Sequence, residues 1–309
     1  MLTKKRVASL FACSFCLVLA SCSDDAPPQP QTSKEPYHPV FNPSPEQIAQ
    51  RQAEEKARLP LKNELPPVVR ADRTAYVDMM APLVPMQLYI ASRAWDESPE
   101  RVADDIGRFG MQVNNQRIIK QGVPAELFEL ADSYSKSNNA FDKADLAKKI
   151  TAYVEQQAGA LGGKRLAKLT LNAHLAPIQP YDLGSRTFAV DTALFTDKTE
   201  YTYEEKEKSR RTMRIEGKLK AHLFSIPSSY QYGFTGASAL ENIKVEDEGI
   251  ARKIEAARTE ASIVVYGYIA RVQRAHDKGM PVDKPYTYVQ PHFADIVSES
   301  GEILYTVEL

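Results

Sequence analysis

The hydrophobic period of the chain changes near Lys164, and this change constrains the fold more than any other feature of the sequence. Before it, apolar residues recur at the three- and four-residue spacing of amphipathic helices, as Val102 and Ile106 do. After it, apolar and polar residues alternate as they do in half-buried strands, for example at Leu169 and Leu171. The sequence therefore predicts an α+β protein in which an N-terminal helical part packs on or beside a C-terminal antiparallel sheet of about six strands.

Three helix starts can be read directly from capping residues. Ser44-Pro45 followed by Gln47 is a capping box with proline in the first turn. Ser98-Pro99 and Pro124 predict two further starts.

The apolar stretch 76–95 contains Pro82 and Pro85. Proline removes a backbone donor and clashes with the preceding turn, so we expect two helices that meet at a bend near residues 81–85.

A long helix is expected to begin at Asp142, which can cap it. Phe141 would then pack on Leu146 as a hydrophobic staple. Gly162 and Gly163 end the helical pattern. The stretch 158–165 has some features of a phosphate loop, but its spacing and its place at a helix end favour a simple helix stop.

Alternating segments fill the C-terminal part. A central strand is expected at 262–272 because it is apolar on both faces, and a closing hairpin turns at Gly301. Pro291 implies an edge or a bulge. One inserted helix is expected at 246–258, and the remaining strands are expected at 169–175, 188–194 and 213–223.

The N-terminus has the features of an export signal. A basic start at Lys4, Lys5 and Arg6 precedes an uncharged run, 7–20, that is too short to cross a bilayer. Leu19-Ala20-Ser21-Cys22 resembles the lipobox of bacterial lipoproteins. The resemblance implies cleavage before Cys22, lipid on its sulfur and acylation of the new amino terminus, for example by palmitate, so that the membrane is one partner through the lipid anchor.

The residues after Cys22 predict where the protein is anchored. Ser23 stands where lipoproteins retained in the inner membrane usually carry Asp, so the resemblance implies transport to the outer membrane with the body facing the periplasm. Asp24 leaves the inner membrane as an alternative. The chain should thus comprise a signal peptide at 1–21, a lipidated proline-rich tether at 22–45, a helical region at 46–163 and a sheet region at 164–309.

Composition excludes several classes of function. Hydrophobic residues make up 43% of the sequence, ample for a packed core. Loss of residues 1–21 removes three cations and no acid, which changes the net charge from −1 to −4, so no binding to nucleic acid is expected. The three cysteines are Cys13, Cys16 and Cys22, so the exported body has no thiol for catalysis or a disulfide.

The body also resembles a group of uncharacterised bacterial lipoproteins that share a domain of unknown function. The resemblance lies in Asn139-Ala140-Phe141-Asp142-Lys143-Ala144-Asp145-Leu146 and in a following strand region with Tyr181 and Phe188. It implies no activity, cofactor or catalytic residue.

Candidate catalytic residues have simpler structural explanations. The five histidines show no metal-ligand spacing, although His174 and His222 could meet across a sheet. Ser238 lies in half of a nucleophile elbow. The acids 246–248 suit the positive end of a helix dipole. No metal or other cofactor is therefore expected.

A candidate contact surface is the stretch 225–238, in which Tyr230, Tyr232 and Phe234 stand among Ser and Gly as in many binding loops. The alternative is an ordinary strand that buries these three aromatic residues on one face.

Taken together, the sequence predicts a lipid-anchored, non-catalytic accessory or binding component of the cell envelope with an envelope protein as its partner. An envelope hydrolase that uses carboxylates is one alternative, because the fold can bring such a pair together without any readable spacing. A structural subunit of an envelope complex is the other.

Overall fold

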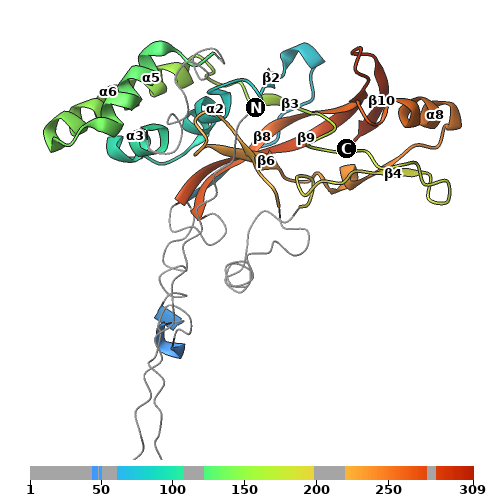
Figure 1. Ribbon diagram of the computed structural model, residues 1–309, viewed down its shortest axis with the longest axis horizontal. Coiled ribbons are helices and arrows are strands. Elements are labelled where there is room, and N and C mark those ends of the chain that lie inside the picture. The colour runs from blue at the N-terminus through green and yellow to red at the C-terminus, as the bar shows by residue number, and fades with distance from the viewer. Residues whose placement is uncertain (1–43, 48, 51–60, 108–121, 198–219, 277–282) are drawn as a thin grey trace, which may run out of the picture. The chain divides into compact units, whose positions relative to one another are not determined.

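The computed structural model describes residues 44–47, 49–50, 61–107, 122–197, 220–276 and 283–309 (Figure 1). The chain divides into two compact units, Met1–Ala53 and Glu54–Leu309. In the first unit, residues 45–47 and 49–50 are helical. The Ser44 amide donates to Gln47 Oε1 over 3.1 Å, and the Gln47 amide donates to Ser44 Oγ over 3.2 Å. The predicted capping box is thus confirmed.

A ladder of two long antiparallel strands, β8 (Ser262–His276) and β9 (Asp283–Val297), forms the centre of the second unit. Each is 15 residues long, and each is flanked on its outer side by two short strands in succession. Along β8 these are β3 (Leu166–Leu171) and β1 (Leu61–Glu64), and along β9 they are β6 (Gln231–Phe234) and β10 (Ile303–Glu308). The central position predicted for β8 is confirmed.

The sheet has eight strands and is mixed, so the fold is α+β, but the expectation of about six antiparallel strands is wrong. β2 (Val77–Asp78) runs parallel to β3, β6 runs parallel to β9, and β5 (Leu223–Phe224) completes the sheet beside β6. β1 and β2 precede residue 164, in the region where only helices were expected. Each is too short to show an alternating pattern, and pairing with a longer neighbour stabilises it. A separate pair is formed by β4 (Thr187–Ala189) and β7 (Asn242–Lys244).

The helices gather at the two ends of the sheet in Figure 1. Four helices pack against one another and form one group: α2 (Val84–Ser92), α3 (Pro99–Gly107), α5 (Ala125–Lys136) and α6 (Ala140–Gly159). The inserted helix, α8 (Glu248–Ala257), lies against β10, and Asp247 caps it through the Ile250 amide. Short 3-10 turns occur at η1 (Arg73–Ala75) and η2 (Ser238–Glu241).

The stretch 76–95 forms strand β2 and helix α2, not the two helices expected from its prolines. Leu83 adopts a left-handed conformation (φ 67°) directly before α2, and Pro85 lies in the first turn of that helix. The proline pair therefore ends an extended segment and starts one helix.

Helix α6 begins three residues earlier than predicted. Asn139 caps it, because its Oδ1 accepts from the amides of Phe141 and Asp142. Phe141 consequently lies in the first turn and is 84% exposed, so the predicted staple on Leu146 does not form. The helix ends at Gly159, and Gly163 takes a positive φ of 75° in the turn that follows, which confirms the helix stop.

One hydrophobic core joins the helices to the sheet. Register and burial place Ile263, Val265 and Val289 on the sheet face that joins this core. Met86, Ile106 and Val154 of the helices belong to the same cluster.

The other face of the sheet carries a smaller aromatic cluster of Tyr76, Tyr266 and Phe293. The segment 65–76 passes over it: Arg70 stacks on Phe293, and Arg73 binds Asp295 with two hydrogen bonds of 2.7 and 2.8 Å.

The predicted irregularity at Pro291 is a bulge. Tyr266 pairs with Phe293 and Gly267 pairs with Pro291, which leaves His292 as an extra residue in β9. The closing hairpin is confirmed as well, with Gly301 at a φ of 87° in its turn.

Candidate functional site

The predicted lipid attachment residue, Cys22, and the tether at 22–45 lie outside the described residues apart from Ser44 and Pro45. Lipidation therefore stays a prediction. Among the helices that the structure describes, none has the length and apolar character needed to span a bilayer.

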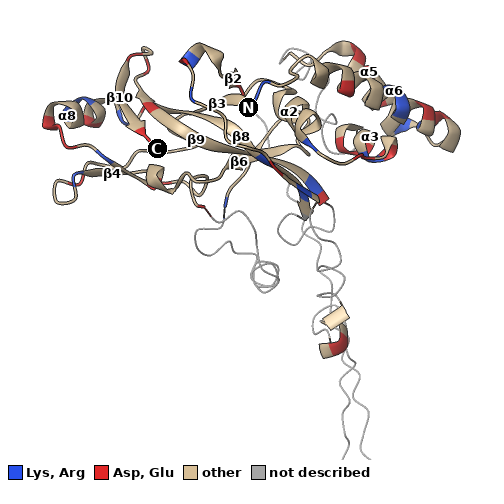
Figure 2. Ribbon diagram, turned by 180° about the vertical axis from the view of Figure 1, so that it is seen from behind, with Lys and Arg blue, Asp and Glu red and all other residues tan. Residues whose placement is uncertain are grey.

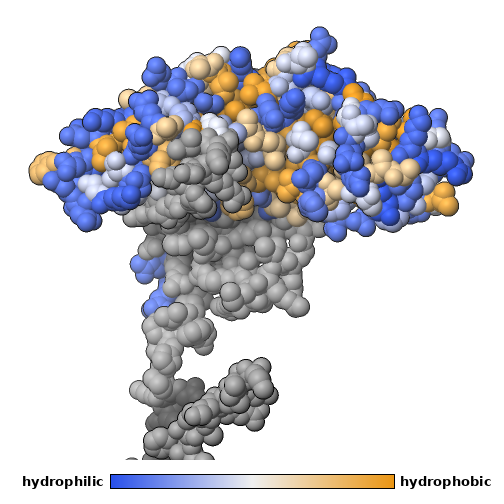
Figure 3. Space-filling view, turned by 45° about the horizontal axis from the view of Figure 1, so that its top comes forward, coloured by the Kyte–Doolittle hydropathy of each residue, from blue (hydrophilic) through white to orange (hydrophobic). Residues whose placement is uncertain are grey.

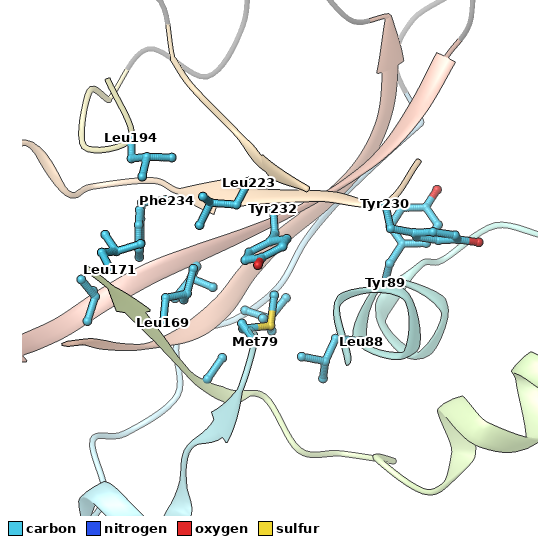
Figure 4. Close-up of a cluster of buried hydrophobic side chains, with 14 of the residues drawn as sticks. Met79, Leu88, Tyr89, Leu169, Leu171, Leu194, Leu223, Tyr230, Tyr232 and Phe234 are labelled. Carbon is cyan, nitrogen blue, oxygen red and sulfur yellow. The ribbon is translucent and has the colours of Figure 1, made fainter. Parts of the chain in front are cut away.

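The aromatic residues proposed as a partner-contact surface are core residues. Tyr230, Tyr232 and Phe234 are at most 2% exposed. Figure 4 shows Tyr232 directed toward Met79 and Tyr230 beside Tyr89. The Tyr89 and Tyr230 rings meet edge to face with centroids 5.6 Å apart. The three side chains are buried in the core, as the ordinary-strand alternative predicts. The prediction that they form a partner-contact surface is therefore corrected.

Other candidates from the sequence are not brought together. His174 is exposed in the turn after β3, whereas His222 packs against Tyr286 with ring centroids 4.7 Å apart. Ser238 is exposed at the start of η2, and no described histidine hydrogen-bonds to it. Within the described ranges no three side chains of His, Cys, Asp or Glu are grouped to hold a metal ion.

The predicted explanation for the acids 246–248 is confirmed. Asp247 caps α8, while Glu246 pairs with Lys244 and Glu248 pairs with Arg252 on the surface. Each acid already has a structural role at a helix start.

A groove open to solvent lies where the C-terminal ends of α2 and α6 meet, and its volume is about 600 Å³. Its floor and walls are shaped by small residues, Ala91, Ala94, Ala158, Gly159 and Gly162. A side chain added at Gly159 would enter open space, because no atom lies within 4 Å of an ideal Cβ there.

The groove is also lined by one aromatic and three charged side chains. Arg93 and Trp95 line it, together with the exposed acids Asp96 and Glu155. Arg93, Trp95 and Asp96 follow the end of α2, and Glu155 lies in α6, which packs on α2, so the fold sets their relative positions.

Glu97 lies behind the groove and holds two of its side chains, Arg93 and Trp95, in place. One of its oxygens accepts from the Trp95 indole (3.2 Å) and the Tyr89 hydroxyl (2.7 Å), and the other accepts from Arg93 Nη1 (2.8 Å). The Glu97 side chain is 3% exposed. Trp95 and Arg93 are thus held by a buried carboxylate before any ligand arrives.

The same carboxylate connects the groove to the sheet. Arg274 of β8 donates to both oxygens of Glu97, and it also binds Asp105 of α3. All three side chains are at most 5% exposed. Charge-assisted hydrogen bonds of this kind need good geometry to offset desolvation, and this network links α3 and the segment after α2 to the sheet.

The protein environment shifts the pKa values of Asp105 and Glu97 in opposite directions. Burial raises the pKa of Asp105 to about 6, against the opposing charge of Arg274. Burial acts on Glu97 in the same direction, but hydrogen bonds and charge from Arg274, with help from Tyr89 and Arg93, leave the pKa of Glu97 below its usual value. Such separation also occurs in acid–base pairs of enzymes. Here neither carboxylate lines the groove, so a substrate there would not reach them.

A second polar cluster lies on the face of the sheet opposite the helices. The Arg271 guanidinium stacks over the Tyr288 ring at 4.4 Å, and Gln273 and His222 lie 3.4 and 3.2 Å from the Tyr288 hydroxyl. These side chains are buried or half-buried, so the cluster presents no open surface for a ligand.

The chain matches no protein-family model, and comparisons with curated proteins and with solved structures found no match either. The geometry of the groove and the sequence of the N-terminus are therefore the features that indicate a function.

Sequence reasoning did not find the groove or its supporting network. It gave no role to Glu97, Asp105 or Arg274. One usable signal was present, since Arg274 follows two residues after the predicted strand 262–272, and a cation that is buried beside such an apolar strand needs an acid nearby.

Proposed function

We propose that this chain is a lipid-anchored protein of the bacterial cell envelope that acts as a non-catalytic binding or accessory component. The lipobox Leu19-Ala20-Ser21-Cys22 supports anchoring, and Ser23 supports the outer membrane with the body in the periplasm. Several acyl chains anchor a protein stably, whereas one chain alone binds only reversibly.

The observation that carries the binding role is the pre-ordered groove. Trp95 and Arg93 are fixed by Glu97 before a partner binds, so little side-chain freedom is lost on association. Aromatic side chains such as Trp95 are also among the types that contribute most at protein interfaces. The buried carboxylates behind the groove are engaged by arginines, which is a structural use of these groups.

Anchoring is tested by Cys22→Ala. The expected result is loss of palmitate labelling and release of the protein from washed membranes, with Cys16→Ala as the matched control that keeps both. Labelling and membrane retention that survive Cys22→Ala would remove the lipoprotein part of the proposal.

The binding role is tested by affinity capture from chemically cross-linked native membranes. Gly159→Leu adds a bulky side chain at a residue that lines the groove, and Ala160→Leu adds the same side chain one residue later, at an exposed position that does not line it. We expect one envelope protein to be captured by the wild type and by Ala160→Leu but not by Gly159→Leu. Capture that is equal in all three, or absent in all three, would reject the groove as the binding site.

A further inference from the structure

The groove between α2 and α6 carries excess negative charge on its open side. Asp96 is exposed at its edge, and the Glu155 side chain is 52% exposed. The one cation among the lining residues, Arg93, has a side chain that is 7% exposed. An incoming ligand therefore meets carboxylates before it meets a guanidinium.

The charge of Arg93 is already paired with acids of the protein itself. Its Nη1 donates to Glu97 over 2.8 Å, and its Nη2 donates to Glu155 over 3.3 Å. Behind the groove, Arg274 is likewise shared between Glu97 and Asp105. Among the side chains that line the groove, two acids, Asp96 and Glu155, stand against one arginine, Arg93, so the surplus at the groove is negative.

Trp95 adds an aromatic surface in the same place. Its indole nitrogen is bound to Glu97, and its ring meets Tyr89 edge to face at 6.1 Å, so the ring orientation is set. Indole is the strongest cation-binding ring among the side chains. A carboxylate on the indole nitrogen and two more at the groove edge reinforce attraction for a cation and oppose an anion.

From these contacts we propose that the groove binds a lysine or arginine side chain on an extended segment of the partner protein. The cation would lie between the Trp95 ring and the carboxylates of Asp96 and Glu155. The small residues Ala91, Ala94 and Gly159 leave room for the backbone on either side. This inference rests on the proposed binding function and specifies the chemistry of the bound segment.

Trp95 makes the test direct, because it is the single tryptophan of the chain. The mature lipidated protein in detergent is titrated with three acetylated, amidated peptides, in which alanine alternates with lysine, glutamine or glutamate. We expect the lysine peptide to change tryptophan emission with saturation and with weaker affinity at higher salt. The glutamine peptide should bind about tenfold more weakly, equivalent to about 1.4 kcal/mol, and the glutamate peptide should not bind.

A charge-matched pair of variants isolates the groove acids. Asp96→Asn with Glu155→Gln should weaken the lysine peptide about tenfold. Glu299→Gln with Glu302→Gln changes the net charge equally in the exposed turn between β9 and β10, and should leave its affinity unchanged. Equal binding of the three peptides, no binding of the lysine peptide, or equal loss in both double variants would overturn the inference.

Two further arms separate the possible failures. Spermidine that binds as tightly as the lysine peptide would replace the partner segment by a free polyamine as the occupant. If capture from membranes still depends on Gly159→Leu while the peptides show no charge preference, the basic segment is wrong and the binding function stands. If the peptides show the charge preference but capture from membranes does not depend on Gly159→Leu, the groove binds basic segments and the proposed role in partner capture is wrong.

Discussion

Arg274 and Glu97 are joined by two hydrogen bonds, from Nε to Oε1 over 2.7 Å and from Nη2 to Oε2 over 3.0 Å. Arg274 belongs to the sheet and Glu97 to the segment between α2 and α3, so the pair fastens the helices to the central ladder. Figure 2 shows the charged residues along the helices and near the ends of β8 and β9. Most of the other ion pairs described have at least one well-exposed side chain, whereas this one is 97% covered on both sides.

Arg274→Met should destabilise the protein by about 3 to 5 kcal/mol, because it removes the partner of two buried carboxylates. Urea denaturation followed by circular dichroism measures the change. Glu97 keeps its bonds from Arg93, Tyr89 and Trp95, whereas Asp105 loses the guanidinium that donates to it, so adding Asp105→Asn to the variant should recover part of the loss.

The matched control for Arg274→Met is Arg252→Met on α8. Arg252 pairs with Glu248, but the two side chains are 77% and 69% exposed. The expected change is at most about 0.5 kcal/mol. Similar losses in the two variants would mean that the buried network contributes no more than a surface pair.

Asp105 should make stability fall as the solution becomes less acidic. Its pKa is raised from 3.8 to about 6 in the folded protein, so between these values the folded state holds a proton that the unfolded state has lost. Its contribution is complete below about pH 4 and disappears as the pH rises through 6, with an upper limit of about 3 kcal/mol. The free energy of unfolding of the wild type minus that of Asp105→Asn should therefore decrease from pH 4 to pH 7. A difference that is constant over this range would contradict the assignment.

Sequence patterns predicted the elements that depend on local signals. The capping box at Ser44, the start of α3 at Ser98, the inserted helix α8 and the bulge at Pro291 are each determined by residues within a few positions. The alternation in β3 was also sufficient to predict strands after the helices and hence an α+β fold.

Long-range pairing explains what the sequence could not predict. β1 and β2 are four and two residues long, and they exist because β8 and β3 offer them backbone partners. The groove depends on the packing of α2 against α6, about 60 residues apart, and no local pattern encodes that contact. Figure 3 shows apolar patches interrupted by hydrophilic side chains on the face that it presents.

Gly267→Ala should disrupt the central ladder. An ideal Cβ at Gly267 would lie 2.2 Å from the carbonyl oxygen of Gln290 in the neighbouring strand, beside the bulge at His292. Backbone on both sides cannot move apart without breaking ladder hydrogen bonds, so we expect a loss of about 3 kcal/mol or more, or failure to fold. Urea denaturation and limited proteolysis distinguish these outcomes. Gly159→Ala, which meets open space, is the control and should be neutral or slightly stabilising. A Gly267→Ala protein as stable as the wild type would show that the strands do not approach as described.

Lys220 should give stability that rises with pH. Its ammonium group donates to the carbonyl oxygens of Leu194 (3.2 Å) and Thr196 (2.9 Å), and burial lowers its pKa from 10.5 to about 7. Between these values the unfolded state holds a proton that the folded state has lost, so folding becomes more favourable as the pH increases. The free energy of unfolding of the wild type minus that of Lys220→Met should therefore grow by about 2 to 3 kcal/mol from pH 7 to pH 9. Lys253→Met on the exposed side of α8 is the matched control for loss of a lysine. Thermal unfolding across this pH range provides the measurement, and a Lys220→Met difference that does not grow relative to the control would show that Lys220 stays charged in the folded protein.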